Sequence, residues 1–501
     1  MIRRLLIANR GEIARRIMRT CRQMGVESVA IYSDVDAGAA HVKDADTAER
    51  VGPAPTSQSY LNIPNVIDAA KRSGADAIHP GYGFLSENAG FADACVQAGL
   101  IFVGPPADVI RRMGSKTASR ATMIAAGVPV VPGATPASQS NADLAAAARD
   151  VGFPILLKAA GGGGGKGMRM VRAEADLDDA IAAARSEAER AFGNGALYVE
   201  RLIEHGRHIE VQLMGDTHGH IVHLFERDCT LQRRHQKVIE EAPAPTLSPG
   251  VRARITAAGV AAGRAVGYVN AGTVEFLLEG AGDDARFYFL EMNTRLQVEH
   301  PVTELVTGLD LVSVQLRVAS GEPLPFTQSD ISATGHAVEC RVYAEDARTL
   351  LPQAGRILLY REPEITGVRV DAGVVAGQTV TVHYDPLLAK VIAHGPTRAE
   401  AIERLYQALG EYDILGLRHN ISFLRALLKR PEVQSSDVYT RFIEEHLGEL
   451  QAGPAAATTA AAAAMAAYVA GRASEPAGVE NQGTRDDLER DPWALLGTVR
   501  W

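Results

Sequence analysis

The chain has 501 residues, of which 46% are hydrophobic and 22% charged, and its formal net charge is −9 at pH 7. This composition is typical of a soluble globular protein and excludes a disordered chain, a collagen-like fibre and a disulfide scaffold. The negative charge disfavours nonspecific binding to nucleic acids or anionic membranes, and the length suggests about three domains.

The N-terminus lacks the apolar core of a signal peptide, and no stretch approaches the ~20 apolar residues of a membrane span. The four cysteines, at positions 21, 95, 229 and 340, do not have the spacing of a zinc or redox motif. We therefore expect a cytoplasmic protein with reduced cysteines.

The first hundred residues alternate short apolar runs with amphipathic stretches. Four runs predict strands: residues 5–8, 28–32, 76–79 and 100–103. Residues 11–24 predict a helix that ends at Gly25. This alternation predicts a parallel sheet with flanking helices. The first strand is not followed by the G-x-G-x-x-G pattern of dinucleotide sites, so NAD binding is not supported.

Five consecutive glycines, residues 161–165, lie between predicted strands at 153–159 and 168–172. Such a run costs backbone entropy, which is explained if the loop packs its amides against phosphate oxygens. It is not a Walker A loop, because Gly167 replaces the Ser or Thr and a strand follows. We predict a glycine-rich flap over phosphates, with a flexible hairpin tip as the alternative. Lys158 and Lys116 are candidates for phosphate contact.

Four longer apolar runs in the centre of the chain also predict strands: residues 210–214, 221–226, 272–278 and 287–292. The polar segment 226–237 follows the second of them. By itself it is compatible with a solvated loop. Beside two nucleotide-type motifs, we interpret it as a further wall of the same pocket.

The segment 291–300 reads Glu-Met-Asn-Thr-Arg-Leu-Gln-Val-Glu-His. If it is extended, alternate side chains share one face: Glu291, Asn293, Arg295, Gln297 and Glu299. Oxygen donors at one end suit Mg²⁺, and a guanidinium and a carboxylate at the other suit a small anion and a general base. Glu275, on a neighbouring predicted strand, is a second metal ligand. We prefer this to a surface strand because residues 287–290 are apolar on both faces, which indicates a central strand.

Together these motifs resemble those of biotin carboxylase, a member of the ATP-grasp superfamily. The resemblance is carried by residues 79–88, 158–168, 226–237 and 291–301 and extends from residue 2 to about residue 448. It implies an α/β chain with an ATP-grasp fold. The expected parts are an N-terminal Rossmann-like parallel-sheet domain (1–113), an ATP-grasp domain (114–330) with a glycine-rich lid subdomain (about 131–203), a C-terminal α+β domain (335–448) and an Ala-rich linker and docking tail (449–501).

The resemblance implies that ATP, Mg²⁺ (or Mn²⁺) and bicarbonate form carboxyphosphate, from which CO₂ passes to N1′ of biotin. By position, ATP would be bound by Lys116, Lys158, Gly164, Gly165, Met168, Glu200, Arg201, Leu202, Ile203, His208, Gln232, His235, Glu275, Leu277 and Glu291. The metal would be held by Glu275, Glu291 and Asn293. Bicarbonate would be bound by Lys237, Arg295, Gln297, Val298 and Glu299. Glu299 would remove its proton, Arg341 would stabilise the biotin enolate, and Tyr82 would lie near the biotin.

The resemblance also bears on partners. Only eight of the 51 basic residues are lysine, and none has the Met-Lys-Met neighbours of a biotin-bearing lysine in this family. We therefore expect biotin on a carrier protein or domain in trans, together with a carboxyltransferase subunit and a homodimer. Residues 491–497 resemble the start of the linking domain of longer acyl-CoA carboxylase α chains. Another bicarbonate-phosphorylating ATP-grasp ligase and a non-catalytic nucleotide-binding scaffold are the alternatives. The final acyl-CoA or keto-acid acceptor stays open.

Overall fold

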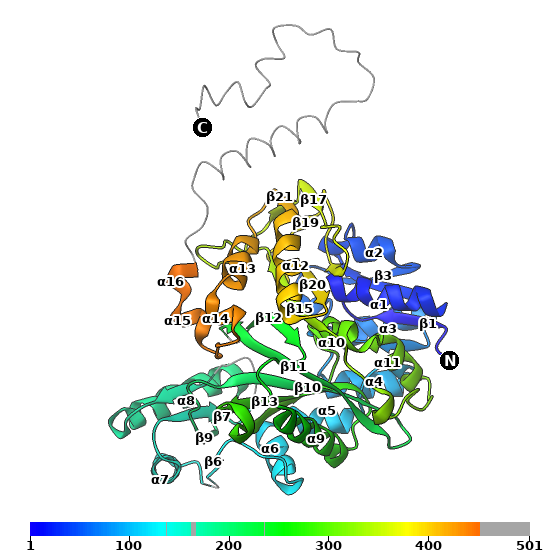
Figure 1. Cartoon of the computed structure of the whole chain (residues 1–501). Helices are drawn as coiled ribbons and strands as arrows, with labels where there is room; N and C mark the ends of the chain where they lie inside the picture. The colour runs from blue at the N-terminus through cyan, green and yellow to red at the C-terminus, as the bar shows by residue number, and fades with distance from the viewer. Residues whose placement is uncertain (137, 162–166, 235, 451–501) are drawn as a thin grey trace, which may run out of the picture.

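The N-terminal part of the chain is a parallel sheet with helices on both faces (Figure 1). The computed structural model describes residues 1–136, 138–161, 167–234 and 236–450. Five parallel strands lie in the order β3-β2-β1-β4-β5. Their bounds are β1 Arg4–Ile7, β2 Glu27–Ser33, β3 Thr47–Gly52, β4 Ala77–His79 and β5 Ile101–Phe102. This confirms the predicted Rossmann-like domain.

Two apolar cores hold the helices of this domain against the sheet. Helix α1 (Gly11–Met24) and helix α11 (Leu311–Ala319) pack on one side, while α3 (Ile63–Ser73) and α4 (Ala89–Gln97) pack on the other. Helix α1 ends at Gly25 with φ 69°, the left-handed conformation that glycine adopts without strain. Helices α2 (Ala40–Asp44) and α5 (Ala107–Met113) complete the domain.

A four-stranded antiparallel sheet forms a separate small layer, the lid, at the lower left of Figure 1. Its strands lie in the order β6-β9-β7-β8, with bounds β6 Gly133–Ala134, β7 Ile155–Ala159, β8 Arg169–Val171 and β9 Leu197–Arg201. Helices α7 (Asn141–Val151) and α8 (Leu177–Phe192) cover it through an apolar core. The tip of the predicted glycine flap, residues 162–166, lies outside the described residues.

An eight-stranded antiparallel sheet joins the centre of the molecule to its C-terminal part. Its order is β14-β13-β10-β11-β12-β15-β20-β18. The bounds are β10 Arg207–Gly215, β11 Ile221–Arg233, β12 Gln236–Ala242, β13 Asn270–Glu279, β14 Arg286–Asn293, β15 His336–Tyr343, β18 Val368–Ala372 and β20 Leu387–Gly395. Because β12 pairs with β15, backbone hydrogen bonds cross the boundary that we predict between residues 330 and 335.

Helices cover both faces of this sheet. Helix α9 (Pro249–Val266) contacts β10 and β11, α10 (His300–Thr307) contacts β15, and α12 (Arg398–Glu411) contacts β15 and β20. The remaining α-helices are α6 Lys116–Ala125, α13 Ile421–Leu428, α14 Pro431–Gln434, α15 Phe442–Glu445 and α16 Leu447–Leu450. Two small two-stranded sheets complete the fold. One pairs β16 Gly355–Arg356 with β19 Thr379–Val380, and the other pairs β17 Leu359–Arg361 with β21 Asp413–Leu415. Among the described residues, no helix is long and apolar enough to cross a membrane. Residues 451–501, which include the tail motif, lie outside the described part.

The segment 226–237 is formed by β11, which continues to Arg233, and by β12, which begins at Gln236, so the alternative of a solvated loop does not hold. Gln232, Gln236 and Lys237 from this segment line a pocket. Two local predictions are wrong. Strand β14 is not central but lies at the edge of the sheet, where the backbone of residues 129–131 bonds to Phe289. Its two faces are apolar because they pack into separate clusters, Phe287 and Phe289 in one and Tyr288 and Leu290 in the other. The extended conformation expected for 291–299 ends at Asn293.

Candidate active site

A pocket of about 430 Å³ lies between the lid and the ends of strands β13, β14 and β15. Most of the residues that the resemblance assigns to ATP, metal and bicarbonate line it, together with Arg341, which the resemblance assigns to biotin: Lys116, Met168, Lys158, His208, Gln232, Lys237, Glu275, Leu277, Glu291, Asn293, Arg295, Gln297, Val298 and Arg341. These residues come from the lid, the central sheet and the turn after β14. The tertiary structure therefore brings together most of the predicted site, although the sequence separates its parts by up to 225 positions.

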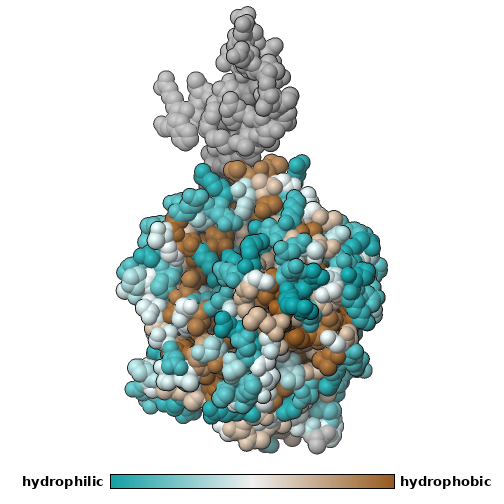
Figure 2. All heavy atoms as spheres, turned by 90° about the vertical axis from the view of Figure 1, so that its right-hand side faces the viewer, coloured by the Kyte–Doolittle hydropathy of each residue, from teal (hydrophilic) through white to brown (hydrophobic). Residues whose placement is uncertain are grey.

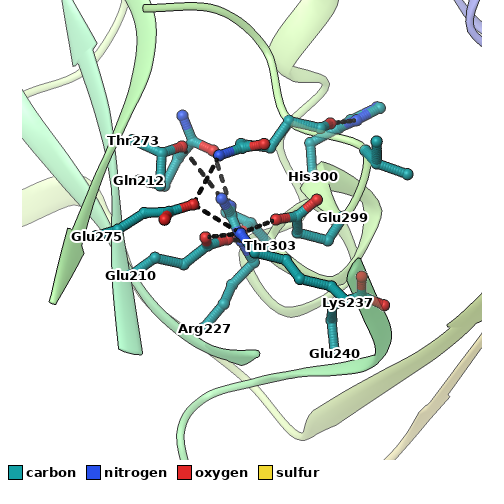
Figure 3. A network of polar contacts seen from close by, with 12 residues as sticks. Glu210, Gln212, Arg227, Lys237, Glu240, Thr273, Glu275, Glu299, His300 and Thr303 are labelled. Carbon is teal, nitrogen blue, oxygen red and sulfur yellow. Dashed lines mark hydrogen bonds and ion pairs between the residues drawn. The ribbon is translucent and has the colours of Figure 1, made fainter. Parts of the chain in front are cut away.

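The ammonium group of Lys237 lies at the centre of three carboxylates (Figure 3). Its Nζ is 2.6 Å from Glu210 Oε2, 2.8 Å from Glu275 Oε1 and 2.7 Å from Glu299 Oε1. Burial acts against the charge on Lys237, but the three carboxylates outweigh it and hold its pKa well above the ordinary value. Lys237 is therefore charged at neutral pH.

Glu210 also pairs with a second buried cation, Arg227. Arg227 is fully buried and donates to Glu210 Oε1, to Gln212 Oε1 at 2.8 Å and to Thr303 Oγ1 at 3.0 Å (Figure 3). Glu210 thus accepts from Arg227 through one oxygen and from Lys237 through the other. A buried carboxylate whose two oxygens both accept from cations holds those cations in place.

Glu299 joins the same centre to strand β15. Its Oε2 lies 3.0 Å from Arg341 Nη2, while its Oε1 pairs with the Lys237 ammonium. Burial favours its neutral form, but Lys237 and Arg341 outweigh this and hold the pKa of Glu299 well below its ordinary value. Arg341 also pairs with Glu240 at 2.5 Å. Burial raises the pKa of Glu240 to about 7, with Arg341 offsetting only part of that effect.

Arg295 is held over the pocket by residues on both sides of it. It donates to Gln297 Oε1 at 2.9 Å and to Asn293 Oδ1 at 3.2 Å, and its Nε lies 3.1 Å from Glu87 Oε2. Glu87, from the N-terminal domain, also accepts from the Thr294 backbone N–H at 3.1 Å. The turn after β14 is therefore tethered to the N-terminal domain, and the guanidinium keeps a defined position for an anion.

The lysines at the nucleotide end lie near a shared carboxylate. Lys158 Nζ, at the end of β7, is 2.5 Å from Glu200 Oε2, and Arg120 pairs with the other Glu200 oxygen at 3.0 Å. Lys116, at the start of α6, lies in the same pocket wall. Protein atoms crowded around Lys116 lower its pKa, although the negative charge of Glu291 opposes the shift. This arrangement provides two ammonium groups at one end of the pocket.

The predicted metal ligands fit a hard cation. Glu275 and Glu291 are opposite each other on β13 and β14, and Asn293 Nδ2 lies 2.8 Å from Glu275 Oε1. Crowding by protein atoms and the charge of Glu275 raise the pKa of Glu291. Such a pair of carboxylates with an amide oxygen suits Mg²⁺. His208 adds a nitrogen 3.2 Å from Glu275 Oε2.

Some predicted residues lie elsewhere. Glu200, Glu299 and Tyr82 are not part of the pocket lining. Glu200 pairs with the lining residue Lys158, Glu299 pairs with the lining residues Lys237 and Arg341, and the Tyr82 hydroxyl donates to Glu12. Arg201 points away, since its guanidinium pairs with Glu279 at 2.7 Å. Ile203 packs beside Leu277 in a small apolar cluster, and the Leu202 backbone N–H bonds to Pro154. Gly164, Gly165 and His235 lie outside the described residues.

A larger groove of about 580 Å³ is not the candidate site. It lies between α4, β5 and the segments near Thr217 and Val269, on the side of the N-terminal domain. Figure 2 views the molecule from the side on which that domain lies in Figure 1, and it shows apolar residues scattered among hydrophilic ones. Asp93 is the one charged side chain among its described lining residues, which gives little basis for binding phosphates.

Comparisons with known proteins agree with the geometry of the pocket. Three family models match consecutive parts of the chain: biotin carboxylase N-terminal domain at residues 1–110, carbamoyl-phosphate synthase L chain ATP binding domain at 115–327 and biotin carboxylase C-terminal domain at 339–445. Biotin carboxylase 2 of Bacillus subtilis is 51% identical over 450 residues, covering 89% of this chain and 100% of that relative. The chain belongs to the biotin carboxylase family. It is an ATP-dependent ligase.

Relatives in the family occur alone and as parts of longer carboxylases. A biotin carboxylase domain dimer of 2-oxoglutarate carboxylase from Hydrogenobacter thermophilus, solved with MgADP, ADP and bicarbonate, has 42% identity and a TM-score of 0.86. That match covers 91% of this chain and 100% of the other. The methylcrotonoyl-CoA carboxylase subunit alpha of Arabidopsis thaliana is 49% identical, but this chain spans only 63% of its length.

Sequence reasoning within this family resemblance missed several residues that build the site. Glu210, Glu240 and Glu87 each contact a predicted site residue, and Arg227 holds Glu210 in place. One signal was available: His208, Glu210 and Gln212 alternate along an otherwise apolar strand, which places three polar groups on one face. Glu87 lies in the motif 79–88 that carries the resemblance, whereas no comparable local pattern marks Glu240, because its partner Arg341 is distant in the sequence.

Proposed function

We propose that this pocket carries out the ATP-dependent carboxylation of biotin by bicarbonate through carboxyphosphate. The observation that carries the proposal is the position of Glu299, whose carboxylate bridges Lys237 and Arg341. A base held between two cations is where an anion that must lose a proton would bind. The pocket also has ammonium groups for phosphates at its other end, so both reactants of the first step have a place.

In the first step, a bicarbonate oxygen attacks the γ-phosphorus of ATP and ADP leaves. Bicarbonate is a weak nucleophile, so the reaction must be accelerated by orienting it against ATP and by positive charges around the reacting groups. Lys237, Arg295 and the Val298 N–H hold the anion, and Glu299 accepts its proton. As Lys237 and Arg341 turn toward the bound anion, their hold on Glu299 weakens and its basicity rises. Lys116 and Lys158 bind the phosphates.

A divalent cation at Glu275, Glu291 and Asn293 would offset the charge of the transferring phosphoryl group. These side chains supply the oxygen donors, and Lys237 keeps Glu275 ionised: burial favours its neutral form, but Lys237 and His208 lower its pKa. In the second step, carboxyphosphate releases CO₂ and phosphate, the N1′ proton of biotin passes to that phosphate, and the resulting biotin enolate attacks CO₂ to form the new N–C bond. Arg341 stabilises the biotin enolate, with Tyr82 near the ring.

Biotin reaches this site on a carrier protein or domain in trans, and a carboxyltransferase subunit uses the carboxylated carrier. A homodimer is the expected form, in keeping with the dimer named for the Hydrogenobacter relative. The proposed division of the chain is 1–113, 114–330 with its lid, 335–448 and the tail 449–501. The final acceptor is not assigned.

Phosphate release by the purified protein tests the proposal. With ATP, Mg²⁺ and bicarbonate, free biotin should stimulate it, and Glu299→Gln should abolish the stimulation. Dependence on ammonia or glutamine in place of biotin would favour a carbamoyl phosphate type of ligase, and nucleotide binding without turnover would favour a scaffold. Either result would overturn the proposal.

A further inference from the structure

Lys390 is a fully buried cation that the proposed mechanism does not use. It lies in β20 and is 0% exposed. Its Nζ donates to the Val298 carbonyl at 2.6 Å and lies 3.4 Å from Glu12 Oε1 and 3.9 Å from Asp371 Oδ2. An ammonium group is costly to bury, and its shortest contact is with the backbone of the predicted bicarbonate turn.

A second buried side chain holds the preceding carbonyl of the same turn. His300 Nδ1 lies 2.7 Å from the Gln297 carbonyl, and the ring is 0% exposed. Burial and the positive charge of Lys390 lower the pKa of His300 well below its ordinary value, so the ring is neutral. Because a carbonyl can only accept, the single ring proton is on Nδ1. Within the described chain, Nε2 has no hydrogen-bond partner.

The contact of His300 with the Gln297 carbonyl sets the direction of the Val298 amide, and the His300 backbone N–H donates to the same carbonyl at 3.3 Å. The Gln297–Val298 peptide is trans, and in a trans peptide the N–H points opposite to the carbonyl. With the Gln297 carbonyl held by His300, the Val298 N–H must point the other way. No described residue accepts a hydrogen bond from it, and Val298 lines the pocket. Lys390, by donating to the Val298 carbonyl, fixes the orientation of the peptide between Val298 and Glu299.

We propose that Lys390 and His300 are positioning residues for bicarbonate: by holding two successive carbonyls, they aim the Val298 N–H into the pocket and fix the peptide that leads to Glu299, which lies behind the lining residues Lys237 and Arg341. This rests on the proposed function, since Val298 is assigned to bicarbonate there. Lys390 also forms an ion pair with Glu12, and Glu12 accepts a hydrogen bond from the Tyr82 hydroxyl. The bicarbonate turn and the predicted biotin residue are therefore linked through one buried ion pair.

The test compares variants that remove or keep each donor. Lys390→Met leaves the Val298 carbonyl unpaired. His300→Leu removes the ring donor, whereas His300→Asn retains an amide N–H near the position of Nδ1. We expect His300→Leu and Lys390→Met to raise the KM for bicarbonate by ~10-fold or more. The KM for ATP should change little, and His300→Asn should restore most of the bicarbonate affinity. Lys429→Met, on an exposed lysine paired with Glu403, is the matched control.

The outcomes separate the two proposals. If the wild type shows no bicarbonate- and biotin-dependent phosphate release, the proposed function fails. If the wild type is active and the folded variants keep the wild-type KM for bicarbonate, the positioning role is overturned. Equal rises in the KM for ATP and for bicarbonate would indicate a general structural defect and would also overturn it. If Lys390→Met does not fold, the His300→Leu and His300→Asn pair decides.

Discussion

Glu299 Oε1 and Lys237 Nζ lie 2.7 Å apart, although 62 positions separate the two residues in the sequence. Lys237 comes from the start of β12 and Glu299 from the turn before α10. The contact places Glu299, the proposed base, next to Lys237, the cation proposed to bind the same bicarbonate. Both charges are shielded from solvent, so each depends on the other.

Glu299→Gln should remove base catalysis while the nucleotide site is kept. We expect biotin-dependent turnover to fall by about 10²–10⁴-fold, because the amide accepts no proton from bicarbonate. The measurement is phosphate release together with ATP binding by calorimetry. Glu403→Gln, an exposed carboxylate, is the control. Wild-type turnover in Glu299→Gln would assign the base elsewhere.

Lys237→Arg should impair catalysis although the charge is kept. Three carboxylate oxygens lie within 2.8 Å of one nitrogen, and a planar guanidinium cannot occupy such a point-charge site. We expect turnover to fall by about 10²-fold. Steady-state kinetics with varied bicarbonate would check this, and turnover like that of the wild type would contradict it.

Lys237→Met should destabilise the fold in a pH-dependent way. In the wild type, the pKa values of Glu275 and Glu299 are lowered. The stabilisation they contribute is therefore present above the unfolded pKa of about 4.3 and lost as the pH falls through their folded values. Without Lys237, burial would instead raise their pKa values, so the folded variant would take up protons on acidification.

The loss of stability in Lys237→Met should therefore be about 3–5 kcal/mol near pH 8 and should shrink toward pH 5. Urea unfolding of both proteins at several pH values measures it. A difference in unfolding free energy that is constant with pH would show that these carboxylates are not controlled by Lys237.

Lys158→Met should weaken ATP binding without changing the use of bicarbonate. Lys158 lies in the lid wall beside Glu200, at the opposite end of the pocket from Arg341. Loss of a charge-assisted contact to phosphate is worth ~1.5–3 kcal/mol, so the KM for ATP should rise about ten- to hundredfold. An unchanged KM for ATP would remove Lys158 from the phosphate site; Lys429→Met is the control.

Removal of divalent cations should abolish turnover, and Glu291→Gln should raise the Mg²⁺ concentration needed for half-maximal rate. Calorimetry provides a second readout, since MgADP should bind more tightly than ADP in the wild type but not in Glu291→Gln. Glu279→Gln is the matched control, because Glu279 lies on the same sheet but pairs with Arg201 outside the pocket. Equal effects of the two variants would contradict the assignment.

The sequence predicted the elements of the N-terminal domain well, because residues 11–24 and the apolar runs carry local periodicity. It failed for the edge position of β14 and for the extended conformation beyond Asn293. Polar residues can be buried when distant partners pair with them, and an apolar edge strand can have its faces covered by distant segments, as Val131 and Ile203 cover Tyr288. Neither kind of partner is visible in a local window of sequence.

By itself, the sequence determined the family, the order of strands and helices and most of the side chains that meet in the pocket, because motif spacing and periodicity are local properties. The tertiary structure decided which charges are paired. Glu210 shares its oxygens between Arg227 and Lys237, and Lys390 reaches the Val298 carbonyl across 92 positions. Such contacts arise from the register of antiparallel strands and the packing of α10 on the sheet. Only the assembled fold determines which charges are buried together, and burial makes their mutual electrostatics strong.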